Sequence, residues 1–240
     1  MEGEKLVAEI PVNSTHLNSR KIHAYICAES WQKNVSFPFA QAPVITVSDS
    51  RFASFSDTVT PQGIMAVCEK RMYHLSDLFG ENSLKNPFLV IGERLSDPGN
   101  IGTLIRTATA AGASGVILSE GSGDIYNPKV IRASAGAIFR IPVIEGANLG
   151  EIIPGLKQQG VNLLAAHLQG AVLPYDLDLK GSLAILIGNE AHGLSDEISN
   201  LADFRVKLPM APDVESLNAS VAGGILLYEV VRQRRGVLIE

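Results

Sequence analysis

Five apolar runs of strand length alternate with stretches of helical period from residue 88 onward. The runs are "FLVIG", "GVILS", "VNLLAA", "SLAILIG" and "FRVKLP", and residues 100–112 and 216–235 have helical periodicity. Strands that are apolar on both faces need helices on both sides, which is the arrangement of a parallel sheet. Residues 88–240 are therefore predicted to form an α/β domain with a parallel sheet. Ligands of such sheets bind at the carboxyl ends of strands, here the loops after residues 92, 119, 166, 188 and 208.

The part of the chain before residue 88 has shorter predicted helices and strands and is richer in Ser, Asn, Pro and Gly. A helix is predicted over "EGEKLVAEI", and strands over "IHAYIC", "VITV" and "IMAVC". Residues 1–80 are thus predicted to form a small α/β domain, and residues 81–87 a linker that ends at Pro87, where a helix could not easily continue.

Composition restricts the classes of protein. The chain is 46% hydrophobic and 19% charged, which is typical of a globular protein. It contains no apolar run of about eighteen residues and no basic N-terminal region before an apolar run, so no membrane span and a cytoplasmic location are expected. Cys27 and Cys68 are too few for a disulfide framework, and no metal-ligand spacing is present, so reduced cysteines and no metal are expected.

The net charge of −5 argues against strong nonspecific binding of nucleic acid through a basic surface, but allows a local basic patch. Two basic clusters are candidates for such a patch. One contains Lys129, Arg132 and Arg140, and the other contains Arg232, Arg234 and Arg235, for which solvated helix faces are an equal explanation.

The first candidate loop is "DPGNIG", between a predicted strand and a predicted helix. The unpaired N–H groups of a helix start can hold an anion, and Gly99 and Gly102 would allow close backbone approach. The loop lacks both GxGxxG and GK[ST], which disfavours a dinucleotide-dependent dehydrogenase or a P-loop NTPase. Arg106 follows on the first turns of the helix and could bind a phosphate through two hydrogen bonds. A simple strand-to-helix turn remains the alternative interpretation.

Two further loops carry polar residues directly after predicted strands. In "LAILIGNEAHGL", Glu190 follows Gly188 and is a structural acceptor, a helix-initiating residue or a general base. In "LPMAPDVESLNASVAGG", Ser216 and Asn218 stand at the predicted helix start, where capping would explain one of them.

Taken in order, "DPGNIGTLIRTA", "NPKVIRASAGAIFRIPV", "ILIGNEAHGL" and "LPMAPDVESLNASVAGGILLYE" closely resemble the motifs of the SpoU (TrmH) family of RNA methyltransferases, in the SPOUT superfamily. The resemblance spans residues 88–235, and residues before it resemble the family's small substrate-binding domain. It implies a SPOUT domain with a deep trefoil knot in residues 186–235, S-adenosylmethionine bound in the knot, and a homodimer.

The resemblance also implies the function and the site. The expected reaction transfers a methyl group from S-adenosylmethionine to a ribose 2′-hydroxyl of structured RNA, ribosomal or transfer. The alternative is a noncatalytic RNA-binding or ribosome-assembly protein on the same fold. The implied residues are Asn100, Arg106, Glu190, Ser216 and Asn218 for catalysis, Ala166, Gly188, Leu208, Leu217 and Asn218 for the cofactor, and Lys129 and Arg132 for RNA. The first loop would then hold an RNA phosphate beside the target ribose, and the general base is left open.

Overall fold

The computed structural model of the chain describes residues 1–12, 18–32, 42–79 and 86–234. Contacts divide the chain into two compact units, Met1–Met72 and Tyr73–Glu240. The division falls before the limit at residue 80 expected from the sequence. Of the predicted linker 81–87, residues 81–85 lie outside the described residues.

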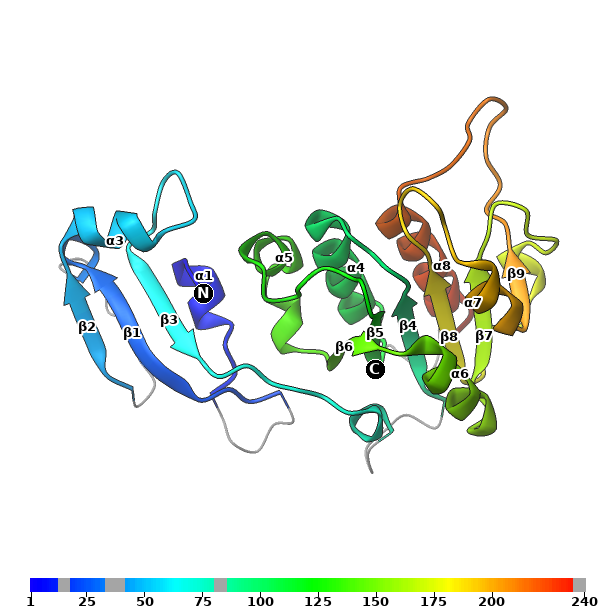
Figure 1. Cartoon of the computed structure of the whole chain (residues 1–240), viewed down its shortest axis with the longest axis horizontal. Helices are drawn as coiled ribbons and strands as arrows, with labels where there is room; N and C mark the ends of the chain where they lie inside the picture. Colours follow the sequence, from blue (N-terminus) through cyan, green and yellow to red (C-terminus); the bar gives the residue numbers. More distant parts are fainter. Residues whose placement is uncertain (13–17, 33–41, 80–85, 235–240) are drawn as a thin grey trace. The chain divides into compact units, whose positions relative to one another are not determined.

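The first unit is a small α/β unit built on a three-stranded sheet. The three predicted strands are present: β1 (Ile22–Ala28) lies in the centre, parallel to β2 (Val44–Val47) and antiparallel to β3 (Ile64–Cys68). Three short helices accompany the sheet: α1 (Glu4–Ala8), α2 (Glu29–Gln32) and α3 (Asp49–Phe55). Helix α1 lies beside β3 (Figure 1), and the side chains of Tyr25, Phe52 and Ile64 are buried in the core.

The second unit contains a parallel six-stranded sheet, which confirms the predicted fold class. The strand order is β6-β5-β4-β8-β7-β9, and every pair in the sheet is parallel. The strands are β4 (Phe88–Gly92), β5 (Gly115–Ser119), β6 (Val143–Ala147), β7 (Asn162–Ala166), β8 (Leu183–Ile187) and β9 (Phe204–Val206). All residues of β4, β5 and β8 are buried, as expected for central strands with helices on both faces.

Helices cover the two faces of this sheet (Figure 1). Helix α4 (Pro98–Ala110) packs between α5 (Pro128–Ser134) and α8 (Ala219–Arg234), and α8 also contacts β8. Helices α6 (Leu149–Gln158) and α7 (Asp196–Leu201) contribute side chains to a core that contains Leu89 and Leu186. Short 3₁₀ turns lie at η1 (Leu75–Leu78), η2 (Ala137–Phe139) and η3 (Pro174–Asp176). Among the helices of the described ranges, none has the length and apolar character of a membrane span.

The order of the strands brings the ligand loops together. The chain runs outward from β4 through β5 to β6, returns to β7, and then places β8 between β7 and β4. The loops after β4 and β8 therefore lie side by side, at the point where the direction of winding reverses. This is the position at which open α/β sheets bind ligands.

Helix α8 is anchored at its end by the buried Arg234, to which neither of the two explanations left open by the sequence, a basic patch or a solvated helix face, applies. The Arg234 guanidinium donates to the carbonyl oxygens of Leu179 and Asn86, both at 3.3 Å, and to that of Gly181, and lies 5.0 Å from the centroid of the Phe88 ring. Arg234 therefore ties the last turn of α8 to the segments that precede β4 and β8. Arg235 lies outside the described residues.

Candidate active site

A cleft of about 460 Å³ lies at the carboxyl ends of β7, β8 and β9, and we call it the loop cleft. Its volume is in the range of small-molecule binding sites. The cleft brings together residues from separate segments that the sequence analysis assigned to catalysis or to cofactor binding. The predicted residues in its lining are Ala166, Gly188, Glu190, Leu208, Ser216 and Leu217.

The backbone is closely packed in the loop after β8, which lines the loop cleft. A Cβ atom on Gly188 would lie 2.1 Å from the Gly193 carbonyl carbon. Asn189 and Gly193 exchange two backbone hydrogen bonds, at 3.0 and 2.9 Å, which close the bend after β8. The loop after β8 is therefore held in one conformation at the cleft.

The carboxylate of Glu190 is bound at the start of α4. It accepts hydrogen bonds from the backbone N–H groups of Ser96 and Asp97, both at 3.2 Å, and from Asn100 Nδ2 at 3.0 Å. Burial raises the pKa of Glu190, but the hydrogen bonds from Asn100 and from the backbone outweigh it, so that the pKa lies below its ordinary value. Glu190 is therefore ionised at neutral pH and occupied by donors.

This geometry corrects the expectation for the first loop. The N–H groups of Ser96 and Asp97 hold Glu190 of the same chain, and the Asn100 N–H donates to Asp97 Oδ1 at 2.8 Å. These groups are thus not free for an RNA phosphate, and Asn100 itself is buried. Gly102 serves helix packing instead of ligand approach, because a Cβ there would lie 2.5 Å from the Ala133 side chain on α5.

Asn218 joins this arrangement from the start of α8. Its Nδ2 donates to Asn100 Oδ1 at 2.8 Å, and its Oδ1 accepts from the Ser220 and Val221 N–H groups at 2.9 and 3.2 Å. Asn218 is thus the residue that caps α8, which begins at Ala219 and not at Ser216. Glu190, Asn100 and Asn218 form one hydrogen-bonded chain across three loops, which we call the polar cluster. Asn218 belongs to this cluster and not to the lining of the loop cleft.

The remaining predicted residues lie outside the polar cluster. Arg106 is exposed on α4 and makes no hydrogen bond or ion pair among the described residues. Ser216 is exposed in the lining of the loop cleft. Lys129 and Arg132 are both exposed on α5. The structure therefore leaves all three cations accessible to an external ligand.

Two residues at the site were missed from the sequence. Glu93 is buried directly after β4, and its carboxylate accepts from Ser195 Oγ at 2.6 Å and from the Ser195 N–H at 2.8 Å. A charged residue directly after a fully apolar strand was the signal that could have identified it. His167 also lines the loop cleft, and its Nδ1 accepts from the Gln169 N–H at 3.1 Å. Nothing in the sequence pattern marks His167.

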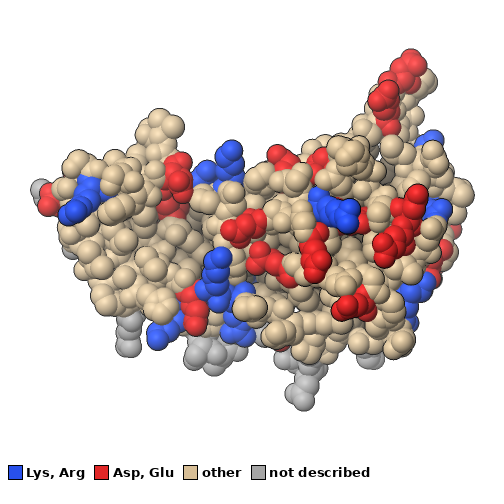
Figure 2. Space-filling model, in the orientation of Figure 1, with Lys and Arg blue, Asp and Glu red and all other residues tan. Residues whose placement is uncertain are grey.

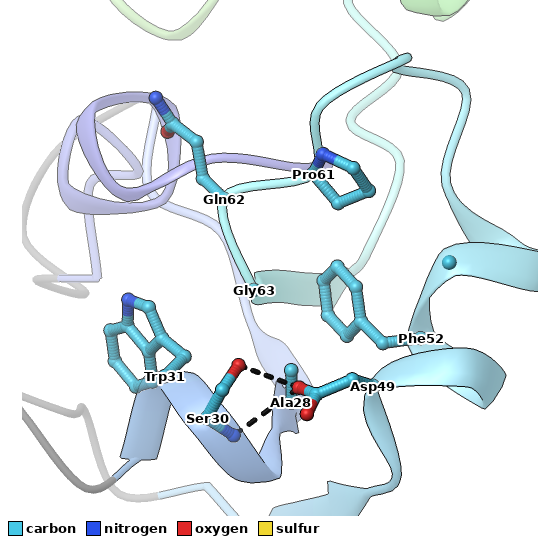
Figure 3. A pocket seen from close by; sticks show the side chains of 9 residues that line it. Ala28, Ser30, Trp31, Asp49, Phe52, Pro61, Gln62 and Gly63 are labelled. Carbon is cyan, nitrogen blue, oxygen red and sulfur yellow. Dashed lines mark hydrogen bonds between the residues drawn. The ribbon is translucent and has the colours of Figure 1, made fainter.

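The first unit contains a second cavity, of about 420 Å³. Ser30 Oγ donates to Asp49 Oδ1 at 2.6 Å at its edge, while Trp31 and Phe52 form apolar walls (Figure 3). Both rings have little exposed surface. Asp49 is the one titratable residue in the described lining, which makes the loop cleft the better candidate for an active site.

A cleft at the strand ends of a parallel α/β unit, beside a partly buried cluster of hydrogen-bonded amide and carboxylate groups, is typical of an enzyme that binds a small organic cofactor. Comparison with known proteins gives the class more closely. Residues 87–228 match the model of the SpoU rRNA Methylase family, and the chain belongs to that family. It is therefore an RNA methyltransferase that uses S-adenosylmethionine.

Relatives and solved structures agree with this family. The 23S rRNA (guanosine(2553)-2'-O)-methyltransferase RlmP of Bacillus subtilis is 34% identical over 184 residues, which are 77% of this chain and 71% of the relative. The SpoU methyltransferase AviRb from Streptomyces viridochromogenes, solved with AdoMet, has a TM-score of 0.85 at 26% identity. The match covers 98% of this chain and 89% of the AviRb chain. The AdoMet-bound rRNA methyltransferase from Sinorhizobium meliloti has a TM-score of 0.81 at 31% identity. The match covers 100% of this chain and 87% of that chain.

The residues of the loop cleft fit S-adenosylmethionine. Peptide groups of the loops at Ala166, Gly188 and Leu208 provide donors and acceptors for a nucleoside, and Leu168 and Leu217 provide apolar surface. Asp196 and Lys207 add one carboxylate and one cation to the lining, which suits the amino acid part of the cofactor.

Proposed function

We propose that the chain methylates a ribose 2′-hydroxyl of structured RNA, ribosomal or transfer. The observation that carries the proposal is the 34% identity with a relative whose name specifies 2'-O methylation of 23S rRNA. The family match over residues 87–228 also includes every residue to which we assign a catalytic role. A cytoplasmic location is part of this proposal, since it follows from the substrate class.

Positioning is the main contribution that we assign to the protein. When bound, S-adenosylmethionine supplies a methyl group on a sulfonium sulfur, and transfer requires the attacking oxygen in line with that bond. Correct orientation of two reactants can contribute about 7–11 kcal/mol to lowering a barrier. The loops at Ala166, Gly188, Leu208 and Leu217 hold the cofactor, and the polar cluster fixes the loops at Gly188 and Leu217 against α4.

The polar cluster acts by position and not as a base. Glu190 is ionised, but its oxygens are occupied by donors, and its lowered pKa makes it a weak proton acceptor. Asn100 and Asn218 hold the first loop and the start of α8 beside it. The group that removes the proton from the hydroxyl is not assigned.

We assign the substrate to the accessible residues. Arg106 binds the phosphate beside the target ribose and favours the developing alkoxide, since arginine stays charged in proteins. Ser216 orients the hydroxyl from the lining of the loop cleft. Lys129 and Arg132 contact the RNA backbone, and the small first domain, residues 1–80 in the sequence-based division, binds RNA as well.

The homodimer is also part of the proposal, as is the trefoil knot of residues 186–235. Helix α8 buries Leu226, Leu227 and Val230, yet Val221, Ile225 and Tyr228 are 49%, 38% and 52% exposed. Their spacing places these three side chains on one face of the helix. A second copy of this chain would cover this apolar stripe.

Transfer of a labelled methyl group tests the proposed function. The protein is incubated with labelled S-adenosylmethionine and with ribosomal or transfer RNA transcribed without modifications. We expect label in RNA, none in protein, and loss of transfer for Arg106→Ala with cofactor affinity nearly unchanged in calorimetry. Label in protein alone would refute the function, and an equal loss of cofactor affinity would refute the role of Arg106.

A further inference from the structure

Arg94 has a backbone conformation that disfavours its side chain. Its φ of 50° lies in the left-handed region, which three non-glycine residues of the described chain adopt: Arg94, Ala135 and Asp213. A Cβ atom makes this region costly, and glycine is the residue that occupies it readily. An arginine at this position therefore needs a reason.

The surrounding loops require this conformation whatever the side chain is. The Arg94 N–H donates to Ser119 Oγ at 2.8 Å, and the Arg94 carbonyl oxygen accepts from Asn189 Nδ2 at 2.8 Å. These bonds hold the backbone between the loops after β5 and β8. Glycine would make both bonds without the conformational penalty, so the side chain contributes nothing to them.

The side chain of Arg94 makes no polar contact with the described residues. It is exposed, and the described residues give it no hydrogen bond or ion pair. A Cβ atom on Gly121 would lie 3.5 Å from Arg94 Cγ, so the aliphatic part of the Arg94 side chain lies beside this glycine in the loop after β5. Nearby Glu93 and Glu190 are occupied by Ser195 and by the start of α4, respectively. An unpaired guanidinium is thus presented at the carboxyl ends of β4, β5 and β8.

We propose that Arg94 binds a phosphate of the RNA substrate at the edge of the active site, and the backbone penalty is retained for this contact. The inference rests on the proposed function. Guanidinium binds phosphate through two parallel hydrogen bonds, and such contacts fix the orientation of a nucleic acid without reading its sequence. Arg94 therefore aligns the RNA from the loop after β4, separately from Arg106 on α4.

Three variants separate the side chain of Arg94 from its backbone. Arg94→Gly removes the guanidinium and relieves the backbone, whereas Arg94→Lys keeps a charge but loses the two-point contact. Ala135→Gly is the matched control, because Ala135 has a φ of 47° and no charge. Each is measured for binding to unmodified ribosomal RNA over a series of salt concentrations, for melting temperature, and for cofactor affinity by calorimetry.

We expect Arg94→Gly to bind RNA about tenfold more weakly, with a log–log salt slope smaller by about one. Its melting temperature should equal or exceed that of the wild type, and its cofactor affinity should not change. Arg94→Lys should keep the salt slope with intermediate affinity, and Ala135→Gly should keep full RNA affinity.

Two results would overturn the inference. Wild-type RNA affinity and salt slope in Arg94→Gly would show that the side chain does not contact RNA. A lower melting temperature in Arg94→Gly would show that Arg94 supports the fold instead. Both differ from a failure of the proposed function, in which the wild type itself transfers no methyl group to RNA.

Discussion

Glu190 shows how one side chain connects two loops that lie far apart in the sequence. Its carboxylate satisfies N–H groups at the start of α4, where negative charge is favoured by the helix dipole. The sequence left three roles open for Glu190, and the geometry favours the structural acceptor. No local pattern could have shown this, because the partners are about ninety residues away, as in the bond from Asn100 across 90 positions.

This bond predicts a pH-dependent stability. Because the pKa of Glu190 is lowered in the folded state, its contribution is complete above the unfolded-state pKa of about 4.3. The contribution is lost as pH falls through the folded-state pKa. Glu190→Gln should therefore melt at a lower temperature than the wild type at pH 7, and the difference should shrink towards pH 3. Scanning calorimetry over this range measures it, and a constant difference would contradict the assignment.

Asn218 has two functions that one substitution separates. Aspartate caps a helix about as well as asparagine, but it has no amide N–H to donate to Asn100 Oδ1. Asn218→Asp should thus keep the cap of α8 and lose about tenfold or more in methyl transfer. Asn218→Ala should lose the cap as well, which costs about 0.5–2 kcal/mol. Unchanged turnover in Asn218→Asp would remove this bond from the account.

At the scale of elements, the apolar runs were sufficient to predict β4, β5, β7, β8 and the edge strand β9, but they did not predict the other edge strand, β6, or the start of α8. Strand β6 has two buried apolar residues, Val143 and Ile144, followed by Glu145 and Gly146, so its run is too short to stand out. The start of α8 was placed at residue 216, because Ser216 and Asn218 are both good caps and only the structure distinguishes them. A sequence pattern shows which residues of a helix or strand are buried. The residue at which the helix or strand begins depends on contacts with distant segments.

Close packing of α4 on α5 gives a stability prediction at this scale. Gly102→Ala would place a Cβ atom 2.6 Å from the Val130 carbonyl oxygen. Relief of this clash requires a shift of the α5 backbone, which is more costly than a change of side-chain conformation. We expect a loss of about 1–3 kcal/mol in the free energy of unfolding, measured by urea denaturation. Gly155→Ala on α6 is the control, since nothing lies within 4 Å of its added Cβ. It should gain about 0.5–1 kcal/mol, because alanine favours helix.

The exposed stripe of α8 predicts the oligomeric state. Tyr228→Glu adds a charge to a face that we propose is buried between two copies, so it should shift the protein from dimer to monomer. Sedimentation velocity measures the shift over a range of protein concentrations. A wild type that is monomeric throughout, or a variant that stays dimeric, would contradict the proposed dimer.

At the scale of the whole molecule, charge limits how the protein can hold RNA. The net charge is −5, and on the face drawn in Figure 2 Lys and Arg lie among Asp and Glu instead of forming one basic field. Binding then depends on few cations, chiefly Arg94, Arg106, Lys129 and Arg132. Four phosphate contacts predict a log–log salt slope of about −3. Titration of RNA binding against salt measures it, and a slope of −6 or steeper would indicate a larger basic surface.

The central claim is that the methyl group goes to a ribose oxygen of RNA. The most direct measurement is alkaline hydrolysis of RNA labelled by the enzyme, because cleavage at a nucleotide requires its free 2′-hydroxyl. The account predicts that the label remains in alkali-resistant dinucleotides. Label recovered in mononucleotides would place the methyl group on a base and contradict the claim.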